Sequence, residues 1–271
     1  PLKLFCLAAS AELGAGLSAA LEVPLAAHEE REFEDGEHKA RPLDAVNGAD
    51  VYVVQSLHSG PKQSANDKLC RLLFFIGAIK DAGAARVTAV TPYLCYARKD
   101  RRTKPNDPVT TRYIAGMFES VGTDCVVTIE VHNPVAFENA FRCRTVALTG
   151  TPLFVDYAKG RADERLSVIS PDAGGMKRAE QLREALETGL GLDGVAHGMA
   201  EVEHGAEARF ARIGADDARF DADAATYDVG QQLRVASHDA GGFARQQLEQ
   251  LRIGDETGLD ELGQAAAIAG G

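Results

Sequence analysis

The chain has 271 residues, of which 45% are hydrophobic, enough for one large or two small globular domains. It contains no apolar run of roughly 18 residues, the length of a membrane span, so the sequence predicts no membrane association. The cysteines are odd in number and none has the spacing of a metal site. We therefore expect reduced thiols in a cytoplasmic protein: Cys6, Cys70, Cys95, Cys125 and Cys143.

Charge is distributed unevenly along the chain. Residues 179–271 contain 18 acidic residues, 7 arginines and no lysine, and the whole net charge of −11 arises there. The same stretch has no proline and no cysteine. A strongly acidic segment repels a phosphate backbone, which argues against nucleic-acid binding.

Apolar runs typical of buried strands alternate with runs of helical periodicity. The expected strands are Leu2–Leu7, Val51–Ser56, Arg86–Thr91, Cys125–Glu130, Arg144–Leu148 and Leu166–Ser170. The expected helices are Ala11–Leu21, Asn66–Asp81, Val109–Val121 and Met176–Leu190, with Asn66 as the cap of the second. This alternation predicts an α/β fold of two doubly wound parallel-sheet lobes. The break at residues 149–152 predicts a domain boundary, with an N-terminal domain over 1–150 and a C-terminal domain over 151–271.

A basic segment follows the third expected strand. Residues 92–108 contain Arg98, Lys99, Arg101, Arg102 and Lys104, and the prolines at 105 and 108 prevent a helix there. Because parallel sheets bind ligands at the carboxyl ends of their strands, this loop suits a polyphosphate. The alternative is a solvated surface loop, although the two tyrosines at 93 and 96 make it less attractive.

Two further polar residues follow strands. His132 comes just after Cys125–Glu130 and can contact a metal or a phosphate, or else form a hydrogen bond in a turn. Asp172 lies in Ser170–Arg178, where a strand, two glycines and a helix start present N–H groups to an anion. Its carboxylate can hold Mg2+ or simply cap the helix.

A turn near the start places an aromatic ring beside acidic groups. Phe33, Asp35 and Glu37 lie in the sequence Glu-Phe-Glu-Asp-Gly-Glu. The ring can stack on a base and the carboxylates can accept from an amino group, or the segment is only an Asp-Gly turn.

Taken in order, these segments resemble the ribose-phosphate pyrophosphokinases, also called phosphoribosyl pyrophosphate synthetases. The resemblance covers about residues 1–190, and the matching pieces are Phe33–Glu37, Val53–Ser56, Asn66–Asp67, Pro92–Arg101, His132 and Ser170–Arg178. It implies lobes of the phosphoribosyltransferase type. It also implies transfer of the β,γ-diphosphoryl group of ATP to C1 of ribose 5-phosphate, giving phosphoribosyl pyrophosphate and AMP, with Mg2+ as cofactor.

The resemblance also implies roles for particular residues. Phe33, Asp35 and Glu37 would bind adenine from a neighbouring subunit. Arg98 and Lys99 would contact ATP, with glutamine more usual in the family at the second position. His132 and Asp172 would lie at the Mg2+ and the ATP phosphates. An adenine site completed by a neighbour implies a homo-oligomer, a dimer at least, with a hexamer favoured by the resemblance.

Two family elements are missing. The family has a catalytic lysine closely followed by arginine on a strand expected here near Val195–Val202, but no lysine follows Lys177. The catalytic residues therefore stay unassigned. The closest match to the ribose-phosphate loop lies within Leu233–Arg245, where Asp239, Gly241 and Gly242 are the candidate ribose 5-phosphate residues; the alternative is chance repetition in a tail rich in Gly and Ala.

Three interpretations of the C-terminal part remain open. The chain is a catalytically inactive, nucleotide-binding regulatory homologue, or it has a variant active site, or the sequence beyond about residue 190 does not correspond to the gene product. A phosphoribosyltransferase is a weaker alternative, because the recognisable segments are those of the ATP side.

Overall fold

The structure is a computed structural model that describes residues 1–159, 167–170, 175–190, 196–201 and 209–212. These residues fall into two compact units, the first containing residues 1–148 and the second the described residues from 149 onward. Asp172, Asp239, Gly241 and Gly242 lie outside the described residues. The expected domains, 1–150 and 151–271, stay a prediction.

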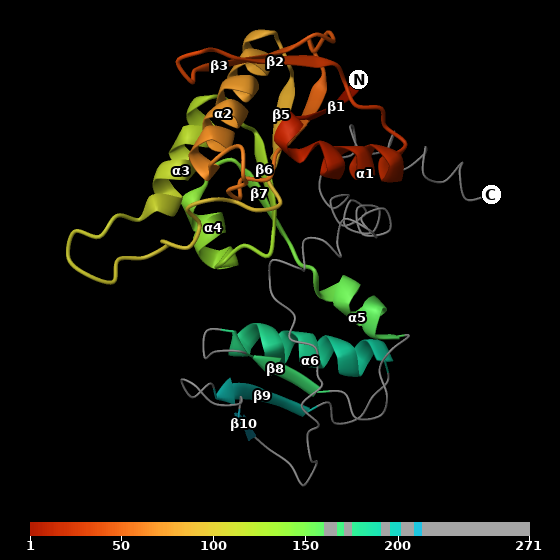
Figure 1. Cartoon of the computed structure of the whole chain (residues 1–271), viewed down its shortest axis with the longest axis vertical. Helices are drawn as coiled ribbons and strands as arrows, with labels where there is room; N and C mark the ends of the chain where they lie inside the picture. Colours follow the sequence, from red (N-terminus) through yellow and green to blue (C-terminus); the bar gives the residue numbers. More distant parts are fainter. Residues whose placement is uncertain (160–166, 171–174, 191–195, 202–208, 213–271) are drawn as a thin grey trace. The chain divides into compact units, whose positions relative to one another are not determined.

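The first unit is built on a five-stranded sheet. Its strands, in spatial order, are β1 (Leu2–Cys6), β4 (Asp50–Val54), β5 (Arg86–Val90), β6 (Cys125–Ile129) and β7 (Arg144–Leu148). Every neighbouring pair is parallel (Figure 1). The α/β fold with a parallel sheet is therefore confirmed, and the five strands lie where the sequence predicts them.

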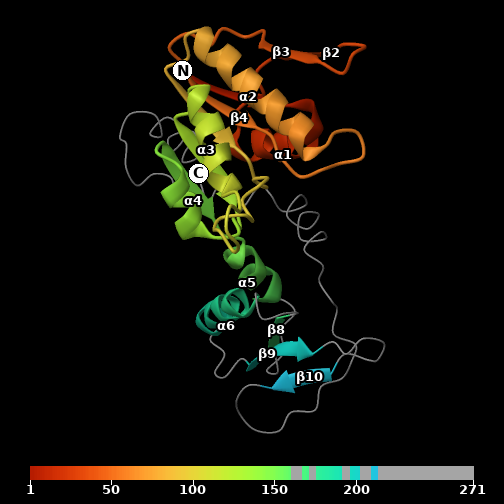
Figure 2. The ribbon, with the colours of Figure 1, turned by 90° about the vertical axis from the view of Figure 1, so that its left-hand side faces the viewer.

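Helices cover the two faces of this sheet unequally. They are α1 (Ala11–Leu21), which follows the short 3-10 turn η1 (Ala8–Ser10), α2 (Ala65–Asp81), α3 (Thr110–Ser120) and α4 (Pro134–Ala140). One core cluster joins Val53 and Val126 of the sheet to Ile76 of α2, Phe118 of α3 and Phe137 of α4. A smaller cluster joins β1 and β4 to α1 on the opposite face (Figure 2). Because α2 runs antiparallel to the strands, its N-terminus lies at their carboxyl ends.

The cap of α2 differs from the prediction. Ser64, and not Asn66, is the N-cap: its Oγ accepts from the backbone N of Asp67 at 3.2 Å. The Asp67 carboxylate in turn accepts from the backbone N of Ser64 at 2.8 Å, which completes a capping box. Asn66 lies within the first turn, where its side-chain oxygen accepts from the phenol of Tyr96.

A two-stranded hairpin was not predicted. Strands β2 (His28–Glu32) and β3 (His38–Pro42) are antiparallel and pack on α2. The His38 ring stacks on Phe74 with centroids 5.4 Å apart, and Arg71 pairs with Glu32 at 3.3 Å. Both strands carry mostly charged side chains, so they lack the apolar alternation by which strands are recognised in a sequence.

The second unit contains α5 (Thr151–Lys159), β8 (Ser167–Ser170), α6 (Met176–Leu190), β9 (Ala196–Glu201) and β10 (Arg209–Arg212). Strands β8 and β9 are parallel, and β9 is the strand expected near Val195–Val202. In contrast to the parallel sheet expected for this lobe, β10 runs antiparallel to β9. The connection between them, residues 202–208, is too short for the crossover that parallel strands need. None of the helices in the described residues combines the length and hydrophobicity needed to cross a bilayer.

Candidate nucleotide site

The two edges of the five-stranded sheet differ in how their charges are compensated. At the amino ends of the strands, Arg86 pairs with Asp50 and Lys80 pairs with Asp124. At the carboxyl ends, Arg98 and His132 are exposed, and neither has an ion pair or hydrogen bond with the described residues. Uncompensated cationic and imidazole groups at the ligand-binding edge of a parallel sheet are suited to an anionic ligand.

The basic segment after β5 is folded upon itself rather than simply solvated. The Lys99 ammonium lies 2.6 Å from Asp107 Oδ2 and donates to Thr103 Oγ1 at 3.0 Å. The same carboxylate oxygen accepts from the backbone N–H groups of Thr103 and Lys104 at 3.1 and 3.0 Å. Lys99, followed by these donors, holds the pKa of Asp107 well below its usual range. Lys99 is therefore engaged within its own loop, whereas Arg98 is not.

Tyr96 fastens the start of this loop to two helices. Its carbonyl accepts from the hydroxyls of Thr110 and Thr111, at the N-terminus of α3, at 3.1 and 3.2 Å. Its phenol donates to the Asn66 side chain in the first turn of α2. The position of the chain next to Arg98 is thus fixed from both sides.

Backbone strain is concentrated at the same edge. Among the described residues other than glycine, positive φ occurs at Glu22, at Tyr96 and Asn106 in the basic segment (60° and 65°), and at Glu130 (50°), two residues before His132. Such conformations are costly and cluster at functional sites. Three of these four residues therefore lie in the loops that carry the candidate ligand-binding side chains.

The turn that carries His132 is joined to the basic segment. Asn133 caps α4, since its Oδ1 accepts from the backbone N of Ala136 at 3.2 Å. Its Nδ2 donates to Asp100 Oδ2 at 2.7 Å. Because Arg98 is close to Asp100 in the chain and His132 adjoins Asn133, the structure brings the segments of these two predicted site residues together.

A complete metal site is not formed by the described residues alone. They contain no group of three His, Cys, Asp or Glu side chains able to hold an ion. Asp172, the other expected ligand, lies outside them. Mg2+ prefers oxygen ligands and takes several of them from nucleotide phosphates and water, so the expected roles of His132 and Asp172 at the metal stay a prediction.

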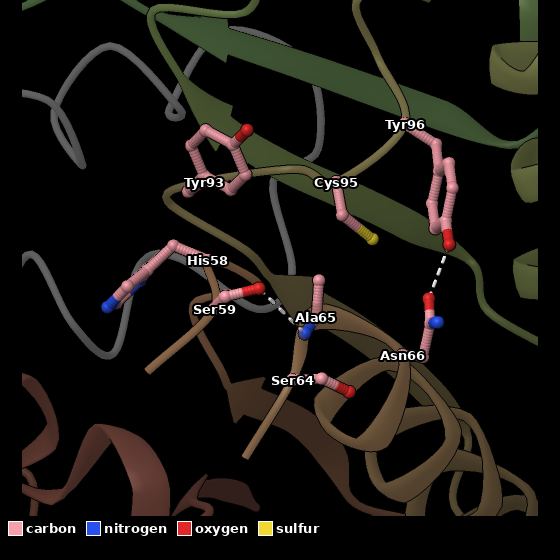
Figure 3. A pocket seen from close by; sticks show the side chains of 8 residues that line it. All are labelled: His58, Ser59, Ser64, Ala65, Asn66, Tyr93, Cys95 and Tyr96. Carbon is pink, nitrogen blue, oxygen red and sulfur yellow. Dashed lines mark hydrogen bonds between the residues drawn. The ribbon is translucent and has the colours of Figure 1, made fainter. Parts of the chain in front are cut away.

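A pocket that sequence reasoning did not identify lies beside this edge. Its volume is about 510 Å³, and it is lined by His58, Ser59, Ser64, Ala65, Asn66, Tyr93, Cys95 and Tyr96 (Figure 3). Ser59 Oγ accepts from the backbone N of Ala65 at 3.2 Å, which holds the loop after β4 against α2. The sequence signals were Asn66, Tyr93 and Tyr96, which stood out for other reasons, and polar residues shortly after a buried strand.

Burial perturbs two titratable groups that line the pocket, His58 and Cys95, and also Lys68 of α2. Burial, with a smaller contribution from Lys68, lowers the pKa of His58, whose Nδ1 lies 3.0 Å from Ser56 Oγ. Burial raises the pKa of Cys95 to about 11, so this thiol is not a nucleophile at neutral pH. Lys68, in the first turns of α2, is only 3% exposed and has no ion pair with the described residues, and burial lowers its pKa.

The predicted adenine residues lie at the tip of the hairpin. Phe33 N donates to Glu37 O at 2.8 Å, Glu37 N donates to Asp35 Oδ1 at 3.1 Å, and the Arg31 guanidinium lies 5.2 Å from the centre of the exposed Phe33 ring. The hairpin lies at the end of the unit opposite to α4 (Figures 1 and 2). The structure does not bring this turn together with His132 within one chain.

Comparison with known proteins identifies the matched part of the chain. Residues 2–122 match the N-terminal domain of ribose phosphate pyrophosphokinase. The chain is 34% identical over 193 residues to ribose-phosphate pyrophosphokinase 1 of Streptococcus agalactiae serotype III (strain NEM316), covering 70% of this chain and 58% of that protein. The enzyme of the same name from Streptococcus pneumoniae serotype 4 (strain ATCC BAA-334 / TIGR4) has the same identity and coverage.

A solved structure supports the same relationship. The crystal structure of phosphoribosylpyrophosphate synthetase from Mycobacterium smegmatis matches with a TM-score of 0.68 and 29% identity, over 78% of this chain and 66% of that one. The chain thus spans 58% of the length of the curated relatives cited above. Over residues 2–122 the chain therefore has the N-terminal domain of a ribose phosphate pyrophosphokinase, and over the longer matched part it is similar to the enzymes of that family.

Proposed function

We propose that this protein is a ribose-phosphate diphosphokinase, which transfers the β,γ-diphosphoryl group of ATP to the C1 hydroxyl of ribose 5-phosphate. The products are phosphoribosyl pyrophosphate and AMP. One observation carries the proposal: Arg98 and His132 stand exposed on two joined loops at the carboxyl edge of a family-type sheet. Attack on the β-phosphorus builds negative charge on phosphate oxygens, and this edge offers groups able to stabilise that charge.

The side chains of this edge would divide the work. The Arg98 guanidinium, which has no acidic partner among the described residues, is available as a two-pronged donor to phosphate oxygens. Lys99 contributes more to the shape of its loop, through Asp107, than to free positive charge. Mg2+ would neutralise phosphate charge when bound, with His132 and Asp172 as its protein contacts. Phe33, Asp35 and Glu37 would bind adenine in a neighbouring subunit, which makes an oligomer part of the proposal.

The ribose 5-phosphate side depends on the C-terminal part of the chain. The strand that carries the family's catalytic lysine corresponds to β9, which contains His197 and no lysine. Asp239, Gly241 and Gly242 are proposed as contacts of the sugar phosphate. Activity therefore tests whether this chain reaches the transition state without the usual lysine.

The decisive experiment measures AMP formation. The full chain is mixed with ATP, Mg2+ and ribose 5-phosphate, and AMP is quantified beside an Asp172→Ala variant. AMP that depends on ribose 5-phosphate and exceeds the variant's background is the expected result. No AMP above that background would overturn the proposal. If calorimetry then shows nucleotide binding without turnover, together with association with an active homologue, the protein is a regulatory partner instead.

A further inference from the structure

We infer that Asn133 and Asp100 form a positioning pair that holds the Arg98 loop against the His132 turn. This inference rests on the proposed function for its catalytic consequence, but its structural content stands alone. Neither residue needs to touch nucleotide. Their contribution would be to keep two ligand-binding loops in register before ligand arrives.

The need for such a pair follows from the exposure of the site residues. Arg98 and His132 are both exposed and lack partners among the described residues, so their own side chains do nothing to fix the distance between them. Their loops leave different strands, β5 and β6. A 1 Å misplacement of a catalytic group is enough to lower a rate by about 100-fold. A contact between the loops is therefore of functional value.

Asn133 is well suited to make that contact. Its two amide ends face opposite kinds of partner: Oδ1 accepts from the backbone N of Ala136 at 3.2 Å, and Nδ2 donates to Asp100 Oδ2 at 2.7 Å. One partner can only donate and the other can only accept, so the orientation of the amide is determined. The main-chain carbonyl of Asn133 also accepts from the backbone N of Phe137 at 3.0 Å, and Phe137 is fully buried in the core. Asn133 is thus a rigid support for Asp100.

The other end of the basic segment is held independently. Tyr96 is bound by Thr110, Thr111 and Asn66, and Lys99 by Asp107. Asp100 lies just beyond these attachments and supplies the link to the β6–α4 turn. Breaking it should free the loop from His132 without unfolding the loop itself.

The chain permits a test that separates this contact from the helix cap. In Asn133→Asp, a carboxylate oxygen still accepts from Ala136 N, so α4 keeps its cap. The other oxygen then faces the carboxylate of Asp100 and repels it. In the double variant Asn133→Asp/Asp100→Asn, the amide and the carboxylate exchange places and the hydrogen bond is restored in the reverse direction. Asn139→Asp, at an exposed position of the same helix, controls for an added negative charge and for the loss of an amide donor, here the bond from Nδ2 to Val135 O at 2.8 Å.

The first readout is limited trypsin digestion, since the basic segment carries several cleavage sites. Asn133→Asp and Asp100→Ala should be cut in residues 98–104 about fivefold faster or more, because a charge-assisted hydrogen bond restrains the loop. The exchanged double variant should return to within about twofold of the wild type, and Asn139→Asp should stay there. Wild-type cutting rates in both disrupting variants would overturn the inference, as would failure of the exchanged pair to restore protection. If Asn133→Asp does not fold, Asp100→Ala, which leaves the cap intact, decides the result alone.

The second readout is kinetic and applies if the protein forms phosphoribosyl pyrophosphate. The disrupting variants should have a lower kcat and a higher KM for ATP than the wild type. In the exchanged double variant both constants should return toward the wild-type values. An inactive wild type would defeat the proposed function and leave the trypsin result unaffected. The two failures are therefore distinguishable.

Discussion

Arg86 and Asp50, on the neighbouring strands β5 and β4, are joined by two hydrogen bonds of 2.9 and 2.6 Å. The pair is partly buried and closes the amino edge of the sheet, far along the strands from the proposed site. The two charges of this pair neutralise each other, as expected for residues with a purely structural role. At the carboxyl edge, by contrast, Arg98 has no acidic partner among the described residues, so its charge is not neutralised by them.

Removal of this pair should therefore cost stability and not ligand binding. We expect Asp50→Asn to lower the free energy of unfolding by roughly 2 kcal/mol, because the two bonds to a charged guanidinium are weakened. Urea unfolding measures the effect. The matched control is Glu29→Gln, which breaks the more exposed pair with Arg41 and should change stability much less, because water screens that pair. Equal effects of the two variants would contradict this prediction.

Substitution of two buried threonines of similar exposure should have opposite effects on stability. Thr111 is 4% exposed and its hydroxyl donates to the carbonyls of Tyr96 and Lys99, both at 3.2 Å. Thr123 is 5% exposed and its hydroxyl has no partner among the residues that the structure describes. Thr111→Val should lower the free energy of unfolding by roughly 1–2 kcal/mol and speed tryptic cutting of the basic segment. Thr123→Val should be neutral or stabilising, and a clear loss of stability in that variant would show that its hydroxyl is bonded in solution.

Adjacent basic residues should differ in their effect on nucleotide binding. Arg98→Gln should raise the Kd for ATP about tenfold or more, because its guanidinium is free to bind phosphate. Lys99→Gln should raise it by at most about threefold, because the Lys99 ammonium is already engaged by Asp107. The family's frequent glutamine at this position agrees with that ranking. Isothermal calorimetry with ATP and Mg2+ measures both, and a larger effect at Lys99 would reverse the assignment.

His38 should make the stability of the first unit depend on pH. Its Nε2 is buried and has no hydrogen-bond partner in the described part of the chain, and burial, followed by the positive charge of Arg71, lowers its pKa. The folded state then binds fewer protons than the unfolded state, so stability is complete above about pH 6.5 and decreases as the pH falls toward the lower, folded-state pKa. His38→Phe keeps the stack on Phe74 and should flatten this part of the profile. Unfolding midpoints between pH 7 and pH 5 test it; His58, shifted in the same direction, remains in both proteins and cancels in the difference.

The largely buried side chain of Lys68 should destabilise the fold. It is 3% exposed, has no ion pair among the described residues, and its pKa is lowered by burial. Lys68→Met keeps the aliphatic length and should raise the free energy of unfolding, as measured by urea unfolding, because no charge is then desolvated. A less stable variant would mean that the ammonium has a compensating partner.

The sheet and its long helices were predictable because their patterns have one physical cause. Strands such as β4 are apolar throughout because helices cover them, and α2 repeats its buried residues with helical spacing. The hairpin was missed because its strands are held by contacts to α2, such as that of His38 with Phe74, and not by an apolar pattern of their own. The seven-residue helix α4, which begins at Pro134, is too short for periodicity to define its extent.

The residues of the candidate site were predictable from the sequence, but the hydrogen bonds that join their loops were not. The position of Arg98 and His132 after buried strands placed both at one edge of the sheet, as the structure has them. Nothing in the sequence joined Asn133 to Asp100, because a hydrogen bond between residues 33 positions apart has no local pattern. The burial of Lys68 could not be predicted either, since a lysine in the first turns of a helix is usually solvated.

The strand order of the first unit also bears on how the protein acquires its structure. Apart from the inserted hairpin, each strand pairs with the one made just before it, from β1 through β4, β5 and β6 to β7. A growing chain can therefore add each new strand of this sheet to an edge that already exists. No early strand has to stay unpaired until a distant later strand is made. Such a topology permits vectorial folding, in which the N-terminal strands pair during translation before the later strands are made.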